Sequence, residues 1–295
     1  MELEFWAELS QAICGVQLEV ALKPRDTYRT ALIVRVHLWA VMHDRPTCWA
    51  CELQNWTTQT RPESLPDQST MSRRLRRPDF DEFLELLHKP LNGKPQPALA
   101  RIVDGKPLEL PNHTSDRDAG WGRGVSRNSV GYKLHMICSG NPMPDAFVIT
   151  SLDVCEKQMA FRMIPRVEGT GYLLADAHYD ASWLFDVCRH HGHQLLCPRA
   201  KPGTGLGHHY VAEDRRRAIE LLEPPGGIND FGPSLFNRRT DIERQFAQLS
   251  CFGGGLNALP TWVRRIWRVR RWVWGKLLVN AARIRRNNAK RRDAA

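Results

Sequence analysis

The sequence lacks any long apolar run. Its longest apolar stretch, Ala31 to Met42, is interrupted by Arg35 and His37, whereas a membrane-spanning helix needs about 20 consecutive apolar residues. The first six residues also lack the positive charge and the apolar segment of a secretory signal. We therefore expect a cytoplasmic protein without a membrane partner.

Cysteine is scarce as well, with 8 among 295 residues. This is too few for a disulfide scaffold, so free thiols are expected. Cys48 and Cys51 have the C-x-x-C spacing, but no second ligand pair follows at a suitable distance, and a helical turn explains them better than zinc does. The motif G-x-x-x-x-G-K-[ST] is absent, which leaves nucleotide hydrolysis without support.

What the sequence does have is positive charge, and it gathers at one end. The chain carries 42 Lys and Arg against 32 Asp and Glu, a net charge of +10. From Pro260 onward, twelve basic residues and four tryptophans accompany a single acid. We expect residues 259–295 to form a basic helix and tail with one apolar stripe, and its arginines to bind a nucleic acid. A docked helix whose basic face merely keeps the protein soluble is the alternative. The candidate DNA-binding side chains are Arg264, Arg265 and Arg268.

The first 98 residues have helical periodicity and suggest an N-terminal DNA-binding region. Residues 47–77 combine a short predicted helix, a polar break and a basic helix capped by Asp67, which is the layout of a helix-turn-helix. An ordinary solvated helix is the alternative. The arginines that could recognise DNA here are Arg73, Arg74, Arg76 and Arg77.

From residue 99 onward the pattern becomes strand-like. Residues 106–110 are expected to turn back after Asp104-Gly105, residues 120–124 to form a mobile loop, and residues 200–236 to be a mostly irregular insertion. The main predicted strands are 98–105, 132–138, 146–150, 171–176 and 194–198, and the predicted helices are 156–164, 182–191 and 239–249. This order predicts an α/β fold over residues 99–258, with a ribonuclease-H-like mixed five-stranded sheet flanked by helices.

Three acids occupy matching places in that order. Asp104 ends the first strand, Asp176 ends the fourth, and Glu243 lies in the late helix. In a ribonuclease-H-like sheet these two strands are neighbours and the helix passes across their ends, so the carboxylates would converge. Mg²⁺ prefers oxygen ligands, and two such ions about 3.5–4 Å apart support phosphoryl transfer. Taken singly, the three acids could equally be a turn residue, a helix cap and a solvated side chain.

Four blocks of sequence carry a resemblance to a known family. The blocks are Ile102–Gly105, Gly131–His135 with Ala146–Thr150, Leu173–Asp180, and Arg239–Phe246. They resemble the DDE-family transposases of bacterial insertion sequences, in the group allied with IS4- and IS5-type elements. Members often have Tyr and Lys where this chain has Phe236 and Ser250. The resemblance implies that two Mg²⁺ ions, for which Mn²⁺ can substitute, are held by Asp104, Asp176 and Glu243. Arg239, one helical turn before Glu243, can reach a phosphate.

The same resemblance implies an enzyme that binds the terminal inverted repeats of an insertion sequence, cleaves double-stranded DNA and joins the freed end to target DNA. It also implies at least a homodimer on the DNA and a place with the nucleoid in a bacterial cytoplasm. Two alternatives stay open. One is a catalytically inactive DNA-binding repressor derived from a transposase, and the other is a ribonuclease-H-like nuclease without strand transfer.

Overall fold

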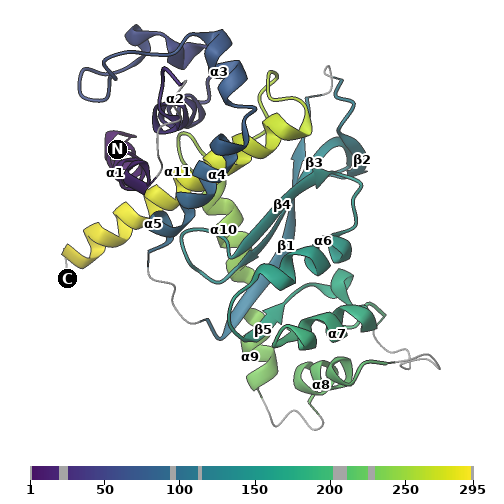
Figure 1. Cartoon of the computed structure of the whole chain (residues 1–295). Helices are drawn as coiled ribbons and strands as arrows, with labels where there is room; N and C mark the ends of the chain where they lie inside the picture. The colour runs from purple at the N-terminus through teal and green to yellow at the C-terminus, as the bar shows by residue number, and fades with distance from the viewer. Residues whose placement is uncertain are drawn as a thin grey trace. The chain divides into compact units, whose positions relative to one another are not determined.

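The structure is a computed structural model that describes residues 2–19, 26–93, 98–111, 115–201, 211–224 and 230–293. The chain forms two compact units. Unit 1 comprises Met1–Lys94 and Gln248–Ala295, and unit 2 comprises Pro95–Ala247. Figure 1 shows that unit 1 is built of helices and that unit 2 contains the sheet.

Unit 1 has the helical N-terminal region that the sequence predicts. Its core includes three tryptophans: the ring of Trp39 stacks on Trp56 at a centroid distance of 4.7 Å, and Trp6 meets both rings edge-on. These contacts bury large apolar surfaces and explain why the segment folds around α2. The helices are α1 (Glu2–Glu19), α2 (Thr30–Met42), α3 (Gln68–Arg74), α4 (Pro78–Leu86), α5 (His88–Asn92) and α11 (Ile266–Asp293).

The predicted helix-turn-helix differs from the structure in its first half. Residues 47–56 form two short 3₁₀ turns, η1 (Trp49–Cys51) and η2 (Leu53–Asn55), instead of an α-helix. The basic helix is present as α3, and the Asp67 carboxylate caps it by accepting the Thr70 N–H at 2.7 Å. Only one α-helix therefore occupies the 47–77 segment.

Helix α11 is less amphipathic than the sequence suggests. Between Trp272 and Ala282 every residue except Trp274 is buried, because α11 packs against α1, α2, α4 and α5. Even the Lys276 side chain is only 1% exposed; it donates to Val41 O and to Asp44. The middle of the helix is thus core, and its exposed arginines lie toward the two ends. Within the described ranges, no helix combines the length and apolarity that crossing a membrane requires.

Unit 2 has the predicted ribonuclease-H-like sheet. The strand order is β2-β3-β1-β5-β6, and β4 also pairs with β3. Strand β1 is antiparallel to β3 and parallel to β5, and β5 is parallel to β6. The strands are β1 (Ala100–Glu109), β2 (Gly120–Arg123), β3 (Asn128–Cys138), β4 (Ala146–Ser151), β5 (Gly171–Leu174) and β6 (His193–Leu196).

The predicted turn at Asp104-Gly105 is wrong. Strand β1 continues through both residues, because Lys106 and Leu108 keep the register with Leu134 and Tyr132 of β3. The long pairing with β3 thus overrides the turn preference of the Asp-Gly pair.

The remaining elements of unit 2 include two helices within residues 200–236, where the sequence suggests irregular chain. The Asp180 carboxylate fixes one of them, α8, through two hydrogen bonds from the Arg215 guanidinium at 2.6 and 2.8 Å. Residues 202–210 and 225–229 of the same stretch lie outside the described residues. The elements are α6 (Glu156–Met163), η3 (Ile164–Arg166), η4 (Ala177–Tyr179), α7 (Ser182–His190), α8 (Glu213–Leu222), α9 (Phe231–Asn237) and α10 (Thr240–Ser250).

Candidate functional site

Two of the three predicted acids meet at the end of β5. Ile102 of β1 lies opposite Leu174 of β5 in the parallel pairing. Two residues further on, the same register places Asp104 beside Asp176. Asp176 directly precedes η4, and its carboxylate accepts the His178 N–H at 2.9 Å. The carboxyl end of one strand thus brings together two acids that are far apart in the sequence.

The environment of Asp104 disfavours its negative charge. Burial raises the pKa of this carboxyl to about 6, and the charges of Asp176 and Glu156 act in the same direction. The hydrogen bond from Gly105 N–H at 2.8 Å and the charge of Arg239 lower the pKa, but they do not offset burial. Asp104 is therefore a carboxylate kept close to like charges and partly out of water, as functional acids often are.

Sequence reasoning assigns no role to Glu156, the first residue of α6. Its carboxylate accepts a hydrogen bond from Lys133 Nζ at 2.8 Å and sits over Gly105, where an added Cβ would lie 3.0 Å from Glu156 Oε1. Tyr179 is buried near the same charges, and burial raises the pKa of its hydroxyl well above the usual value. The sequence signals for these neighbours are the glycine after Asp104 and the acid at a predicted helix start.

The third predicted acid, Glu243, does not join the pair. Its side chain, on α10, is 67% exposed, and one oxygen lies 3.9 Å from the guanidinium of Arg239, four residues earlier and just before the helix. Arg239, directly before α10, carries a charge that acts on Asp104. Among the described residues, no three Asp, Glu, His or Cys side chains gather closely enough to hold a metal ion.

The pair of Asp104 and Asp176 nevertheless suits a hard divalent cation. Carboxylate oxygens are the ligands that Mg²⁺ and Mn²⁺ prefer. Burial, together with the charges of Asp176 and Glu156, raises the pKa of Asp104, and a bound cation would offset both effects. The residues present therefore fit such an ion.

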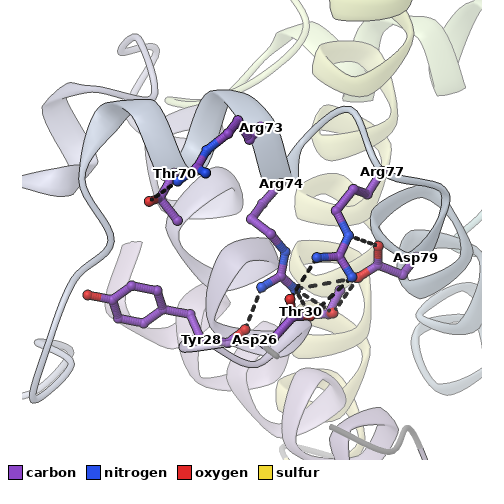
Figure 2. Close-up of polar contacts among 8 residues, drawn as sticks. All are labelled: Asp26, Tyr28, Thr30, Thr70, Arg73, Arg74, Arg77 and Asp79. Atoms are coloured by element: carbon purple, nitrogen blue, oxygen red, sulfur yellow. Dashed lines mark hydrogen bonds and ion pairs between the residues drawn. The ribbon is translucent and has the colours of Figure 1, made fainter. Parts of the chain in front are cut away.

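Arg74, one of the four arginines predicted to contact DNA around α3, is turned into unit 1. It is 7% exposed and donates to Tyr28 O at 2.6 Å and to Thr30 Oγ1 at 2.9 Å, and it lies 3.4 Å from the Asp79 carboxylate. Figure 2 shows the guanidinium directed at these groups. Its hydrogen bonds are thus used to hold α3 against the start of α2.

Arg77 is used in the same way. It donates to both carboxylate oxygens of Asp26, at 2.7 and 3.1 Å, and to Asp79 at 2.9 Å (Figure 2). These bonds lower the pKa of Asp26 and raise that of Arg77. We call Asp26, Arg74, Arg77 and Asp79 the arginine cluster; the structure uses both of its arginines within unit 1 rather than leaving them to a ligand.

Three other predicted arginines remain exposed. Arg73 lies on the outer side of α3, and Arg76 and Arg268 flank the Trp267 ring at 5.5 and 4.7 Å from its centroid. A guanidinium over an indole keeps its outer edge open to a phosphate. These side chains, unlike the arginine cluster, are available to an anionic partner.

The other two predicted tail arginines precede α11. Arg264 donates to the carbonyls of Pro260 and Val263, at 2.9 and 2.8 Å. Arg265 has a φ of 73°, a left-handed conformation that ends the loop before the helix. Both are half-buried, and they shape the start of α11.

Residues 95–278 match the family model described as the transposase DDE domain, a range that covers more than half of the chain and holds Asp104, Asp176 and Glu243. No curated protein and no solved structure matches the chain.

Proposed function

Because the chain belongs to the transposase DDE domain family, we propose that it is an active transposase of an insertion sequence. It binds the terminal inverted repeats, cleaves the DNA there and joins the freed ends to target DNA. The observation that carries the proposal is that Asp104 lies within reach of the charge of Asp176, two residues beyond the parallel pairing of β1 with β5, with its pKa raised to about 6. An acid pair without compensation is costly to the fold, and cation-assisted chemistry explains its presence.

In this proposal Asp104 and Asp176 hold two Mg²⁺ ions, for which Mn²⁺ can substitute, and Glu243 is the third ligand. When bound, such ions activate an attacking oxygen and stabilise the leaving oxygen of a phosphodiester. Asp104 must lose its proton to serve as a ligand. Cation binding should therefore be favoured above pH 6 and weakened below it.

Arg239 links DNA binding to the acid pair. In the structure its charge opposes that of Asp104 and lies 3.9 Å from Glu243. A DNA phosphate forms stronger, bidentate hydrogen bonds with a guanidinium than this long contact does. When Arg239 turns to the phosphate, Glu243 is released toward Asp104 and Asp176.

Double-stranded DNA is the partner. The exposed residues Arg73, Arg76 and Arg268 contact its phosphates, Arg264 and Arg265 contribute positive charge beside them, and Arg74 and Arg77 position α3. Joining two ends requires two active sites, so the working form on DNA is a homodimer. We place this activity in a bacterial cytoplasm, at the nucleoid.

The test is nicking of a supercoiled plasmid that carries the DNA flanking the gene on both sides, with Mg²⁺ or with EDTA. Asp104→Asn, Asp176→Asn and Glu243→Gln should each lower the nicking rate at least about 100-fold, because each removes charge that the reaction centre needs. The control is Asp241→Asn, which removes a carboxylate from α10, the helix that also carries Glu243. Asp241 pairs with Arg244 at 2.7 Å and has no place in the proposed site. Full activity in all three site variants would overturn the proposal.

The same assay separates the two alternatives. A repressor derived from a transposase would bind the flanking DNA and leave it intact in Mg²⁺ and in Mn²⁺. A nuclease would nick the plasmid but never yield flanking DNA joined to a target plasmid. Metal-dependent joined products, lost in the three site variants, are the expected result.

A further inference from the structure

The ribbon formed by β2 and β3 presents an unusual outer face. Along Gly120–Val125, glycines alternate with Trp121, Arg123 and Val125. Successive residues of a strand point to opposite sides, so Trp121 and Arg123 of β2 share one side, and Val125 follows just beyond the strand. All three are exposed, Trp121 by 64% and Val125 by 75%.

The glycine side explains why this ribbon is a supported strand rather than the mobile loop that the sequence suggests. An added Cβ at Gly122 would lie 2.7 Å from Leu152 O, and one at Gly124 would meet the Glu109 carboxylate. That carboxylate also accepts the Val125 N–H at 2.7 Å. The backbone is thus held against its neighbours, and the larger side chains have only the solvent side to occupy.

The outer face continues across to β3. Trp121 lies opposite Val130, and Arg123 lies opposite Asn128. Arg127 in the connecting turn is exposed as well. None of these outward positions is acidic, and Glu109 is engaged on the other side. We call these residues the ribbon face: Trp121, Arg123, Val125, Arg127, Asn128 and Val130.

We propose that the ribbon face is a DNA-contact surface, in which the Trp121 indole stacks on a base and Arg123 and Arg127 bind the phosphates beside it. The inference rests on the proposed function, because that function makes DNA the substrate. An exposed indole with two guanidinium groups further along the same ribbon is complementary to a nucleotide chain, which offers aromatic faces and negative charges.

The sheet register sets the distance from the acid pair. Leu110 N–H donates to Val130 O at 3.0 Å, so Trp121 stands level with Leu110, six residues beyond Asp104. At about 3.3 Å per strand residue this is about 20 Å, or about six nucleotides of B-form DNA at 3.4 Å each. In Figure 1, β2 lies at the end of the sheet away from β5. The contacted base should therefore lie about six nucleotides from the cleaved phosphate.

The test is equilibrium binding of the full chain to a duplex that carries one flank of the gene, measured over a series of salt concentrations. Trp121→Ala should weaken binding by about 5- to 100-fold, the range expected for one stacked base, and should leave the salt dependence unchanged. Arg123→Gln with Arg127→Gln should lower the slope of log affinity against log salt by about two. The matched control is Trp183→Ala, because Trp183 is also exposed, by 45%, in the same unit.

Equal affinity in Trp121→Ala and Trp183→Ala, with both folded by circular dichroism, would overturn the inference. So would a Trp121→Ala variant that loses self-association in sedimentation but keeps its DNA affinity, since β2 ends the sheet and could pair with a second copy. Asp104→Asn separates this inference from the proposed function. It should abolish nicking and leave binding intact, so loss of one property does not imply loss of the other.

Discussion

The arginine cluster of unit 1 and the acid pair of unit 2 solve the problem of partly buried charge in opposite ways. In the cluster, Arg77 forms a two-pronged hydrogen bond with Asp26, and Arg74 lies against Asp79. In the pair, Asp104 faces the charges of Asp176 and Glu156, and burial raises its pKa to about 6. The first region is compensated within the fold, and the second is not.

The difference distinguishes charges that stabilise the fold from charges that are available to a ligand. A buried charge with bonded partners contributes to one particular fold, and losing a partner is costly. A charge left among like charges weakens the fold unless a ligand compensates it. The predictions below test this contrast, beginning with the largest expected effect.

Arg74→Ala should destabilise the protein by removing one arginine of the arginine cluster. It removes the hydrogen bonds to Tyr28 O and Thr30 Oγ1 and a charge beside Asp79, which keeps Arg77 as a partner. It should lower the free energy of unfolding by about 3–5 kcal/mol, because each buried group left without its donor costs about 1–3 kcal/mol. Urea unfolding followed by tryptophan fluorescence measures it. The neighbouring Arg73→Ala is the control: its side chain is exposed, and a change within about 0.5 kcal/mol is expected. Equal effects from the two would refute a structural role for Arg74.

Asp104→Asn should raise the free energy of unfolding, which is the opposite effect to that of Arg74→Ala. The amide removes a carboxylate whose pKa rises from 3.8 to about 6 on folding, and the cation-free protein should gain about 3 kcal/mol at pH 7. The folded chain holds this proton more tightly than the unfolded chain does. The destabilisation by Asp104 is therefore absent below pH 4, grows between pH 4 and pH 6, and is complete above pH 6.

Urea unfolding of wild type and variant at pH 4 and pH 7, with EDTA present, measures this. The two proteins should differ clearly at pH 7 and little at pH 4. Asp241→Asn, on the exposed side of α10, should shift neither value. A variant that is less stable than wild type at pH 7 would show that the fold itself uses the Asp104 charge.

Magnesium should offset the destabilisation that the charge of Asp104 causes at the acid pair. At ten times its dissociation constant, a ligand that binds only the folded state stabilises it by about 1.4 kcal/mol. Wild type should gain this amount at pH 7, and Asp104→Asn should gain almost none. Because protons compete for Asp104, the gain should fade as the pH falls through 6. A gain in wild type that persists at pH 4 would place the ion elsewhere.

The sequence predicts the strand order and the meeting of two acids, because both follow from local patterns and from parallel pairing. Asp104 lies in β1 and Asp176 lies just beyond the end of β5, and the parallel pairing of these two strands brings the acids near each other. The continuation of β1 beyond Gly105 could not be predicted, since it depends on pairing with β3 far along the chain. The position of Glu156 near Asp104 could not be predicted either, because it depends on the packing of α6 over Gly105, which has no side chain.

The arginines around α3 show the same limit. Arg73 and Arg74 are adjacent and chemically identical, yet one is exposed and the other is buried against Tyr28 and Thr30. Those partners lie more than 40 positions away in the sequence, so no local pattern distinguishes the two arginines. Burial of the middle of α11 has the same origin in distant helices.

Arg239→Gln makes the smallest and most specific change. Arg239 supplies the positive charge that lowers the pKa of Asp104, so its removal should shift the pH midpoint of the magnesium-dependent gain upward, by less than about one unit. The control is Arg238→Gln, because this neighbouring side chain is exposed. Thermal unfolding with and without Mg²⁺ across pH 5 to 8 measures both, and an unmoved midpoint would exclude electrostatic contact with Asp104. An upward shift in Arg239→Gln alone would show that the acid pair has one partial partner in the fold. This partner lies directly before α10, the helix that carries Glu243, so this stretch of the chain would connect the charge balance of the pair to the arrival of a phosphate.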